Sequence, residues 1–389
     1  MPTVRNSEVI EAIEAIEAMD PMRLLAARTL TWALLFGGWL VLGTLGQLRL
    51  PLWAGGLAPV ALWLGTAGLV RCGRSISLSA AWLRAIVVLA GLATAAALAG
   101  AAEGGGVLAI AAASIGWGVL LVAASRTVQM ARAATRRPPS PVVPAAAGAA
   151  LAWMVAGDPA TGSSVAAALW PAAIALPALL LAALVPGHGT RKGGRPGLFD
   201  CTSMAAGWAP WRDPATWAVQ SARWAMLPMM ASLAVTSQWC GSAWGLSPSQ
   251  ASGLHLGAML LPPLVLHLSR VRLPNAMGVG LAMAAGLVML CALPGLQGLM
   301  AASMCHSLAW GLASFAQVDA PPVSRSPNLP LGVLRAVAPA CCVWVLGLAI
   351  ADSGPWALWW VHFTLGALAT VGSVVGLCRP AFFRMERKP

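Results

Sequence analysis

Charged side chains are scarce in this sequence, at 9% of its 389 residues, whereas hydrophobic side chains make up 59%. The apolar runs are long enough to cross the roughly 30 Å of hydrocarbon in a bilayer many times. The composition therefore indicates a polytopic membrane protein, with the lipid bilayer as its first partner. The formal net charge is +12, but the basic residues form no patch interleaved with aromatic side chains, which argues against nucleic-acid binding.

The motifs of common enzymes are also missing. The sequence has no histidine cluster with acids, no glycine-rich phosphate loop beside a strand and no nucleophile next to a base. We therefore expect no enzymatic activity, no catalytic residue and no resident cofactor. The eight cysteines lack the paired spacing of a secreted framework, so no structural disulfide is expected.

Carboxylates are absent from the interior of every apolar run. An ionisable group in hydrocarbon is costly and is retained for a task, and the protonatable candidates that remain are His255, His306 and His362, with His267 near the end of a run. A charged organic substrate would need a buried counter-charge. The substrate is therefore either apolar or a cation bound by neutral ligands.

Twelve apolar spans can be read along the chain, the weakest being the short, Ala-rich fifth. They lie at about 29–48, 51–70, 82–102, 106–125, 142–157, 164–186, 222–241, 250–268, 275–294, 296–316, 331–351 and 354–377. With the N-terminus inside, every Lys and Arg except Arg49 falls on the cytoplasmic side. We expect an all-α integral membrane protein with twelve transmembrane helices in two six-helix halves and cytoplasmic termini.

The expected domain organisation follows from these spans. An acidic cytoplasmic segment (1–28) precedes the first six-helix half (29–186), a central cytoplasmic loop (187–221), the second half (222–378) and a basic tail (379–389). Within the acidic segment, Glu8–Met19 is expected to form a short helix on the cytoplasmic surface. Its charge is opposite in sign to the start of a signal peptide, so no cleavage is expected.

Soft metal-ligand residues recur at helical spacing in spans seven and eight. Met226 and Met230 are four residues apart, as are His255 and Met259, so each pair shares a helix face. Thioethers with an imidazole suit a soft cation such as Cu(I). Span ten adds a possible secondary set of Met300, Met304, Cys305 and His306. The alternative is packing, because methionine fills gaps between helices and a lone histidine often caps a carbonyl.

A weak internal repeat accompanies the six-plus-six plan. Arg71-Cys72-Gly73-Arg74 follows span two, and Arg270-Val271-Arg272 follows span eight. Together with the long central loop, this plan resembles the major facilitator superfamily. The family's gating turn would correspond to Arg71, Gly73, Arg74 and Arg270, although Val70 stands where the family has an aspartate.

A methionine pair in span seven, His-x-x-x-Met in span eight, then Pro262-Pro263 and Arg270, resembles the CcoA-like copper importers of that superfamily. The resemblance implies a secondary transporter in a bacterial-type cytoplasmic (inner) membrane, with copper as its transported substrate. It also implies a ligand set of Met226, Met230, His255 and Met259, with Cys240 as the counterpart of a copper-handling thiol.

Two other functions stay open. The first is a facilitator that exports apolar compounds through a greasy cavity lined by residues such as Trp310 and Met283. The second is a non-transporting membrane assembly factor that holds a protein partner through Trp208 and Trp211 of the central loop.

Overall fold

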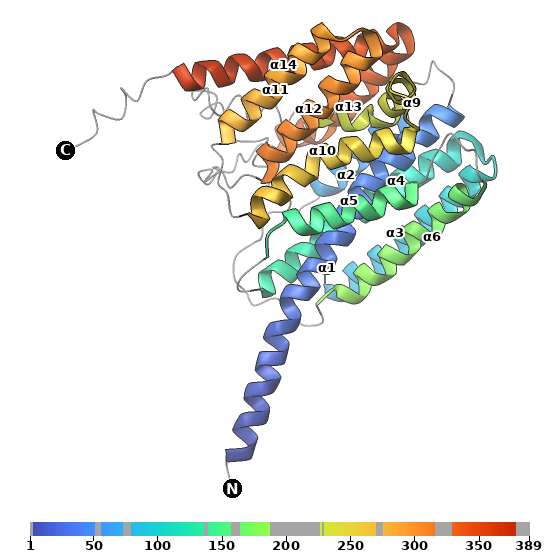
Figure 1. Ribbon diagram of the computed structural model, residues 1–389. Helices are drawn as coiled ribbons and strands as arrows, with labels where there is room; N and C mark the ends of the chain where they lie inside the picture. Colours follow the sequence, from blue (N-terminus) through green and yellow to red (C-terminus); the bar gives the residue numbers. More distant parts are fainter. Residues whose placement is uncertain are drawn as a thin grey trace.

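The computed structural model describes residues 3–50, 56–72, 79–135, 139–156, 164–186, 226–227, 229–269, 275–315 and 329–378, and regular secondary structure in these ranges is helical throughout. The helices pack together in one bundle (Figure 1). In chain order they are α1 (Thr3–Arg49), α2 (Ala58–Cys72), α3 (Ala80–Ala102), α4 (Gly106–Ala134), α5 (Val142–Ala156), α6 (Ser164–Leu184), α9 (Leu233–Ala243), α10 (Pro248–Leu268), α11 (Asn275–Ala292), α12 (Gly295–Phe315), α13 (Leu329–Ser353) and α14 (Pro355–Cys378). Each span predicted from the sequence overlaps one of these helices.

Five helices in the described ranges contain a stretch long and apolar enough to cross a membrane. These stretches are Pro21–Arg49, Ala80–Ala102, Gly106–Arg132, Pro248–Leu268 and Pro355–Val375, and shorter apolar helices are Val142–Ala156, Leu169–Leu184, Gly278–Ala292 and Val337–Ser353. Large apolar side chains such as Leu89, Leu108 and Val288 are exposed on the outside of the bundle, where lipid would cover them. The chain is a multi-pass membrane protein.

The first helix is longer than the sequence predicts. We expected a separate acidic helix over Glu8–Met19, but α1 continues from Thr3 to Arg49, and its N-terminal part extends away from the bundle (Figure 1). Glu and Ala favour the helical state, and α1 accommodates Pro21 in its interior. The acidic segment is thus helical as expected, but it is continuous with the first span.

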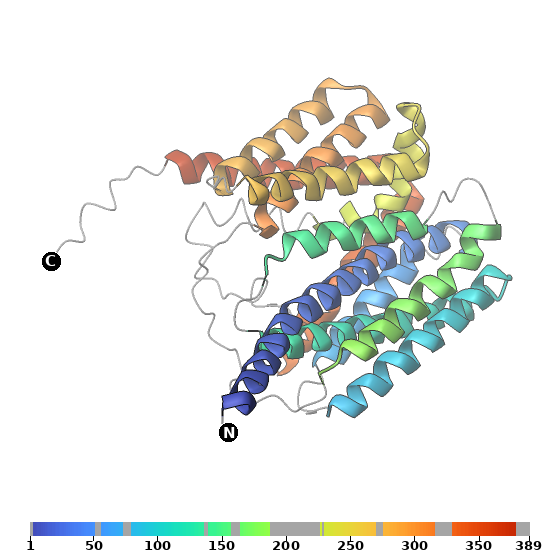
Figure 2. The same ribbon diagram turned by 60° about the horizontal axis from the view of Figure 1, so that its bottom comes forward.

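The packing of α1–α6 recurs in the second half of the chain. Span seven, which includes α9, counts as the first helix of the second half. The third helix of each half (α3 or α11) packs on the fourth (α4 or α12) and on the sixth (α6 or α14). The fourth helix also packs on the first (α1 or α9) and on the second (α2 or α10). Between the halves, α2 packs on α13, α5 on α10 and α1 on α9. These pairings are unchanged when the halves are exchanged, as an approximate two-fold relation requires. Figure 2 shows α9–α12 above the α1–α6 layer.

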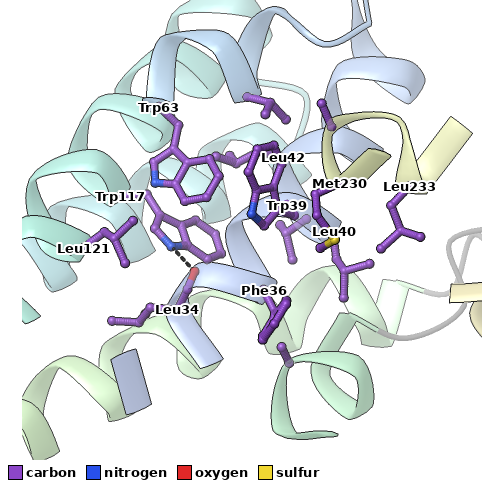
Figure 3. Close-up of a cluster of buried hydrophobic side chains, with 14 of the residues drawn as sticks. Leu34, Phe36, Trp39, Leu40, Leu42, Trp63, Trp117, Leu121, Met230 and Leu233 are labelled. Carbon is purple, nitrogen blue, oxygen red and sulfur yellow. Dashed lines mark hydrogen bonds between the residues drawn. The ribbon is translucent and has the colours of Figure 1, made fainter. Parts of the chain in front are cut away.

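Tryptophan side chains fill the core of the first half. Trp39 and Trp63 meet edge to face with ring centroids 5.1 Å apart, and both are fully buried. Gly38 permits this approach, since a Cβ there would lie 2.9 Å from the Trp63 ring. The indole N–H of Trp117 donates to the Leu34 carbonyl at 2.9 Å (Figure 3). The core of this half is therefore tightly packed and rich in tryptophan.

Candidate functional site

The sequence of α10 fixes where His255 and Met259 stand. The Ser247 hydroxyl accepts a hydrogen bond from the Gln250 N–H, and the Gln250 side chain accepts one from the Ser247 N–H, which completes a capping box. Pro248 occupies the first turn, where a missing N–H costs nothing. His255 and Met259 then lie one turn apart on the same face.

His255 is held as a metal-ligating histidine would be. Its side chain is 1% exposed, and Nδ1 lies 2.9 Å from the Ala251 carbonyl oxygen. Because a carbonyl oxygen only accepts, Nδ1 carries the proton and Nε2 keeps its lone pair. Nε2 is buried without a hydrogen-bond partner among the described residues. The histidine does cap a carbonyl, as the packing alternative expects, but this bond leaves a ligand atom available.

Met259 is fully buried at a close contact between α10 and α12. A Cβ on Gly311 of α12 would collide with the Met259 carbonyl, so glycine at this position allows the approach. The α10 face that carries His255 and Met259 therefore points into the second half, against α12, rather than toward lipid.

Span seven has a turn at Ser232 that the predicted apolar span at about 222–241 did not include. In the described residues, a helical turn at 229–231 is separated from α9 by a turn at Ser232. The Ser232 hydroxyl donates to the Met229 carbonyl at 3.2 Å, a local bond that competes with the regular helical pattern. The backbone of Ser232 stays in the right-handed helical region, and its carbonyl accepts a hydrogen bond from the Thr236 N–H at 2.7 Å, so the turn is a local irregularity of this span.

The methionines of span seven face different neighbours. Met230 is 1% exposed and lies beside Trp39 and Leu40 of α1, close to Leu233 (Figure 3). Met229 is 2% exposed, and its sulfur accepts a hydrogen bond from Ser307 of α12 at 3.2 Å. Met226 is half-buried. The methionine side chains thus reach the contact between the halves as well as the interior of the second half.

Further hydrogen bonds connect polar side chains across the second half. The hydroxyls of Ser237 in α9 and Ser252 in α10 lie 2.8 Å apart. On α12, Ser303 bonds to His362 of α14 at 2.9 Å, and His362 bonds to His306 at 2.9 Å. Both histidines were predicted as protonatable candidates, whereas neither serine was predicted as a site residue. The spacing Ser303-x-x-His306-Ser307, one polar face of a helix, was the available signal.

The remaining predicted residues occupy varied positions. Met300 and Cys240 are buried, while Met304 and Cys305 are half-buried. Within the described ranges, no group of three or more His, Cys, Asp or Glu side chains could hold a metal ion. A soft cation bound by the described residues would therefore need thioether ligands in addition to imidazole.

Other predictions receive less support or fall outside the described part of the chain. Trp310 and Met283, suggested as the lining of a greasy cavity, are both buried in packed clusters. Arg71 lies near the end of α2. Gly73, Arg74 and Arg270 of the turn motif, and Trp208 and Trp211 of the central loop, lie outside the described residues.

No protein-family model matches the sequence, and a search of curated proteins finds no match. Solved structures do share the fold. The nucleoside transporter NupG aligns over 95% of this chain and 100% of its own, with TM-score 0.56 and 15% identity. The peptide transporter POT, in complex with sulfate, aligns over 95% of both chains, with TM-score 0.52 and 14% identity.

A bacterial homologue of the human lysosomal transporter Spinster, in an inward-facing and unoccupied conformation, aligns over 94% of this chain and 96% of its own, with TM-score 0.50 and 14% identity. The chain therefore shares the all-helical fold of these solved structures. Each of these three solved structures is that of a transporter.

Proposed function

We propose that the chain is a secondary transporter of the major facilitator type that moves Cu(I) across a bacterial-type cytoplasmic membrane. All twelve spans would cross the bilayer, with both termini in the cytoplasm. The halves 29–186 and 222–378 would rock about their contact and expose the site to each side in turn.

The lone pair of His255 carries the copper proposal. It belongs to a buried neutral imidazole that is oriented by a backbone carbonyl and lies one turn from the buried Met259 on the same helix face. A soft, weakly hydrated cation fits this environment, whereas a hard cation prefers oxygen ligands. An organic anion would need a buried positive charge, and the Lys and Arg residues inside the predicted spans of the second half are Arg223 and Arg335, both near the start of their span.

His255 and Met259 would form one station of the path on α10. Met230 and Met226 would form another on span seven, where Met230 contacts α1 of the other half (Figure 3). Two stations that take the ion in succession agree with the separate surroundings of these side chains. A movement of one half against the other would change the distance between the stations.

Copper content of cells tests this proposal. A deletion strain is compared by mass spectrometry with strains that express the wild type, the double variant Met230→Leu/His255→Ala, or the control Met22→Leu/His267→Ala. Met22 and His267 are both exposed, so the control changes the same residue types outside the site. The wild type and the control should restore copper, and the site variant should not, with equal protein in the membrane. Normal copper in the site variant would contradict the proposal.

A further inference from the structure

Span seven sends two neighbouring methionine side chains into different parts of the molecule. Met230 lies beside Trp39 of the first half (Figure 3). Met229 is 2% exposed, and its sulfur accepts a hydrogen bond from the Ser307 hydroxyl of α12 at 3.2 Å. The spacing in the sequence favoured Met226 and Met230 as the ligands of this span. Of the two neighbours, however, Met229 is the one that contacts α12.

One face of α12 carries Ser303, Ser307 and Gly311, which follow one another at intervals of four residues. A Cβ on Gly311 would collide with the Met259 carbonyl of α10. One turn earlier, the Ser307 hydroxyl contacts the sulfur of Met229. Four residues of helix rise by about 6 Å, so α10 and span seven meet this face of α12 at neighbouring turns.

The helices α10 and α12 begin at the same end of the second half. The Gln297 side chain, in the first turn of α12, donates a hydrogen bond at 3.3 Å to the carbonyl of Ala243, where α9 ends. The next helix along the chain is α10, which begins shortly afterwards at Pro248 and packs on α12. The two helices therefore lie side by side and run in the same direction.

This shared direction indicates which residues of α10 and α12 lie at one level. Met259 lies against Gly311, so His255 and Ser307, each four residues earlier, lie together at the next level. Because the Met229 sulfur contacts Ser307, it lies at the level of His255 as well. Span seven thus brings a thioether to the level of the imidazole on α10.

The imidazole of His255 brings a free nitrogen to the same region. Nδ1 bonds to the Ala251 carbonyl of its own helix, and Nε2, on the other side of the ring, is buried without a partner among the described residues. His255 lies close enough to His362 of α14 for charges on the two rings to interact, and His362 bonds to Ser303 on the same face of α12. His255 is therefore near this face of α12, as the register of α10 indicates.

The hydroxyl of Ser307 can release the sulfur of Met229 without losing its hydrogen bond. It has one proton and two acceptors, the Ser303 carbonyl at 2.9 Å and the Met229 sulfur at 3.2 Å. When the sulfur binds a cation, the hydroxyl can donate to the carbonyl, so no buried donor is left unsatisfied. In the ion-free protein, the same hydroxyl holds the thioether on the α12 side.

We propose that Met229 is a Cu(I) ligand that acts with His255 and Met259, and that Ser307 is a positioning residue for its sulfur. This role of Met229 rests on the proposed function, since it adds a ligand to the station on α10. An imidazole and two thioethers form a neutral set of nitrogen and sulfur ligands that suits Cu(I). Met230 remains with the other station, at the contact with the first half.

Competition with a chelator measures Cu(I) binding by the full-length protein in lipid nanodiscs. Met229→Leu conserves the side-chain volume and should lower the affinity by about tenfold at an unchanged unfolding temperature, because one of three ligands is lost. The control Met283→Leu replaces a buried methionine of α11 and should leave the affinity unchanged. Wild-type affinity in Met229→Leu would overturn the ligand role.

X-ray absorption at the copper edge shows directly whether the Met229 sulfur binds the ion. The sample carries less than one Cu(I) per protein, so that the tightest site is filled first. The wild type should show two sulfur neighbours and one nitrogen, and Met229→Leu should show one sulfur. Met230→Leu should keep both sulfurs, since that side chain faces the first half. A sulfur count that does not fall in Met229→Leu would overturn the ligand role.

A serine substitution tests the positioning role. Ser307→Ala should weaken Cu(I) binding by about tenfold, the smaller of the effects usual for residues that orient a ligand. In the ion-free protein it should also move the ¹³C NMR signal of the Met229 methyl group, because the thioether can then adopt several rotamers. The control Ser114→Ala removes a buried serine of α4 that bonds to the Ile110 carbonyl of its own helix, and should change neither quantity. An unchanged methyl signal or affinity in Ser307→Ala would overturn the positioning role.

The outcomes separate the ligand role of Met229 from the proposed function. A wild type that binds Cu(I) through other ligands overturns the role of Met229 alone, and the copper content of cells still decides transport. A wild type that binds no Cu(I) overturns both. A wild type that binds Cu(I) at Met229 but does not restore copper in cells overturns transport and keeps the site.

Discussion

The two halves share a packing plan but differ in how their buried hydroxyl groups are bonded. In the first half, buried hydroxyls bond to their own helix four residues back, as Thr94 does to the Ala90 carbonyl. In the second half, buried side chains also bond from helix to helix, as Ser252 does to Ser237. A hydroxyl that bonds within its own helix needs nothing from a neighbour, whereas bonds between helices depend on how those helices are placed. A movement of one helix against another in the second half would therefore change the hydrogen bonds of its buried side chains.

The buried groups without partners differ in the same way. In the described part of the first half they include the indole N–H of Trp39 and of Trp63, which can only donate. In the second half they include Nε2 of His255 and Nε2 of His306, atoms that can bind a cation or a proton. Under the proposed function, the first half would have a supporting role and the second half would carry the transport chemistry.

Removing an indole from the first half should have the largest effect, and that effect should be on stability. Trp63→Ala should lower the free energy of unfolding by about 3 kcal/mol, because the space left in a close-packed core fills only partly. Trp82 is exposed on α3, so Trp82→Ala should cost much less. Denaturant titration in detergent measures both. Equal losses would show that Trp63 is not part of a packed support.

Removing the ligand atom from the second half should abolish transport with little loss of stability. His255→Ala should reduce Cu(I) uptake by at least about 100-fold, since losing a residue that only orients a ligand already costs 10–100-fold. His267→Ala, on the exposed end of the same helix, should leave uptake unchanged. Vesicle uptake and thermal unfolding are measured on the same samples. Retained uptake in His255→Ala would show that His255 in the second half is not needed for transport, which would contradict the proposed difference between the halves.

A thioether can be exchanged for a side chain of similar volume. Met259→Leu should keep the unfolding temperature, because the volume is conserved, and should lower the affinity for Cu(I) by about tenfold, or about 1.4 kcal/mol. Met283→Leu replaces a buried thioether of α11 and should change neither quantity. Competition with a chelator of known affinity measures the binding. An unchanged affinity in Met259→Leu would show that Met259 contributes to packing and is not a Cu(I) ligand.

The smallest effects are expected at helix caps, which allow a matched test in both halves. Ser79→Ala in α3 and Ser247→Ala in α10 each remove a side-chain cap and should each cost about 1 kcal/mol of stability. Only the α10 variant should also weaken Cu(I) binding, because α10 carries His255. Loss of binding in both variants would indicate a general effect of stability.

The sequence predicts the positions of the helices well, because the length of an apolar run is set by the thickness of the bilayer. It also places His255 and Met259 on one face, since that follows from helical spacing alone. The turn at Ser232 was missed because apolar residues continue on both sides of it. The contact of His306 with His362 was missed because the two histidines are 56 positions apart in the sequence, and no local pattern indicates such a pairing.

The most direct test of the account is Cu(I) uptake by vesicles that contain the purified protein, with wild type and His255→Ala compared at equal protein density. The account predicts uptake by the wild type and uptake at the level of empty vesicles for the variant. Equal uptake by both, or none by the wild type, would contradict the claim that His255 in the second half binds the transported ion.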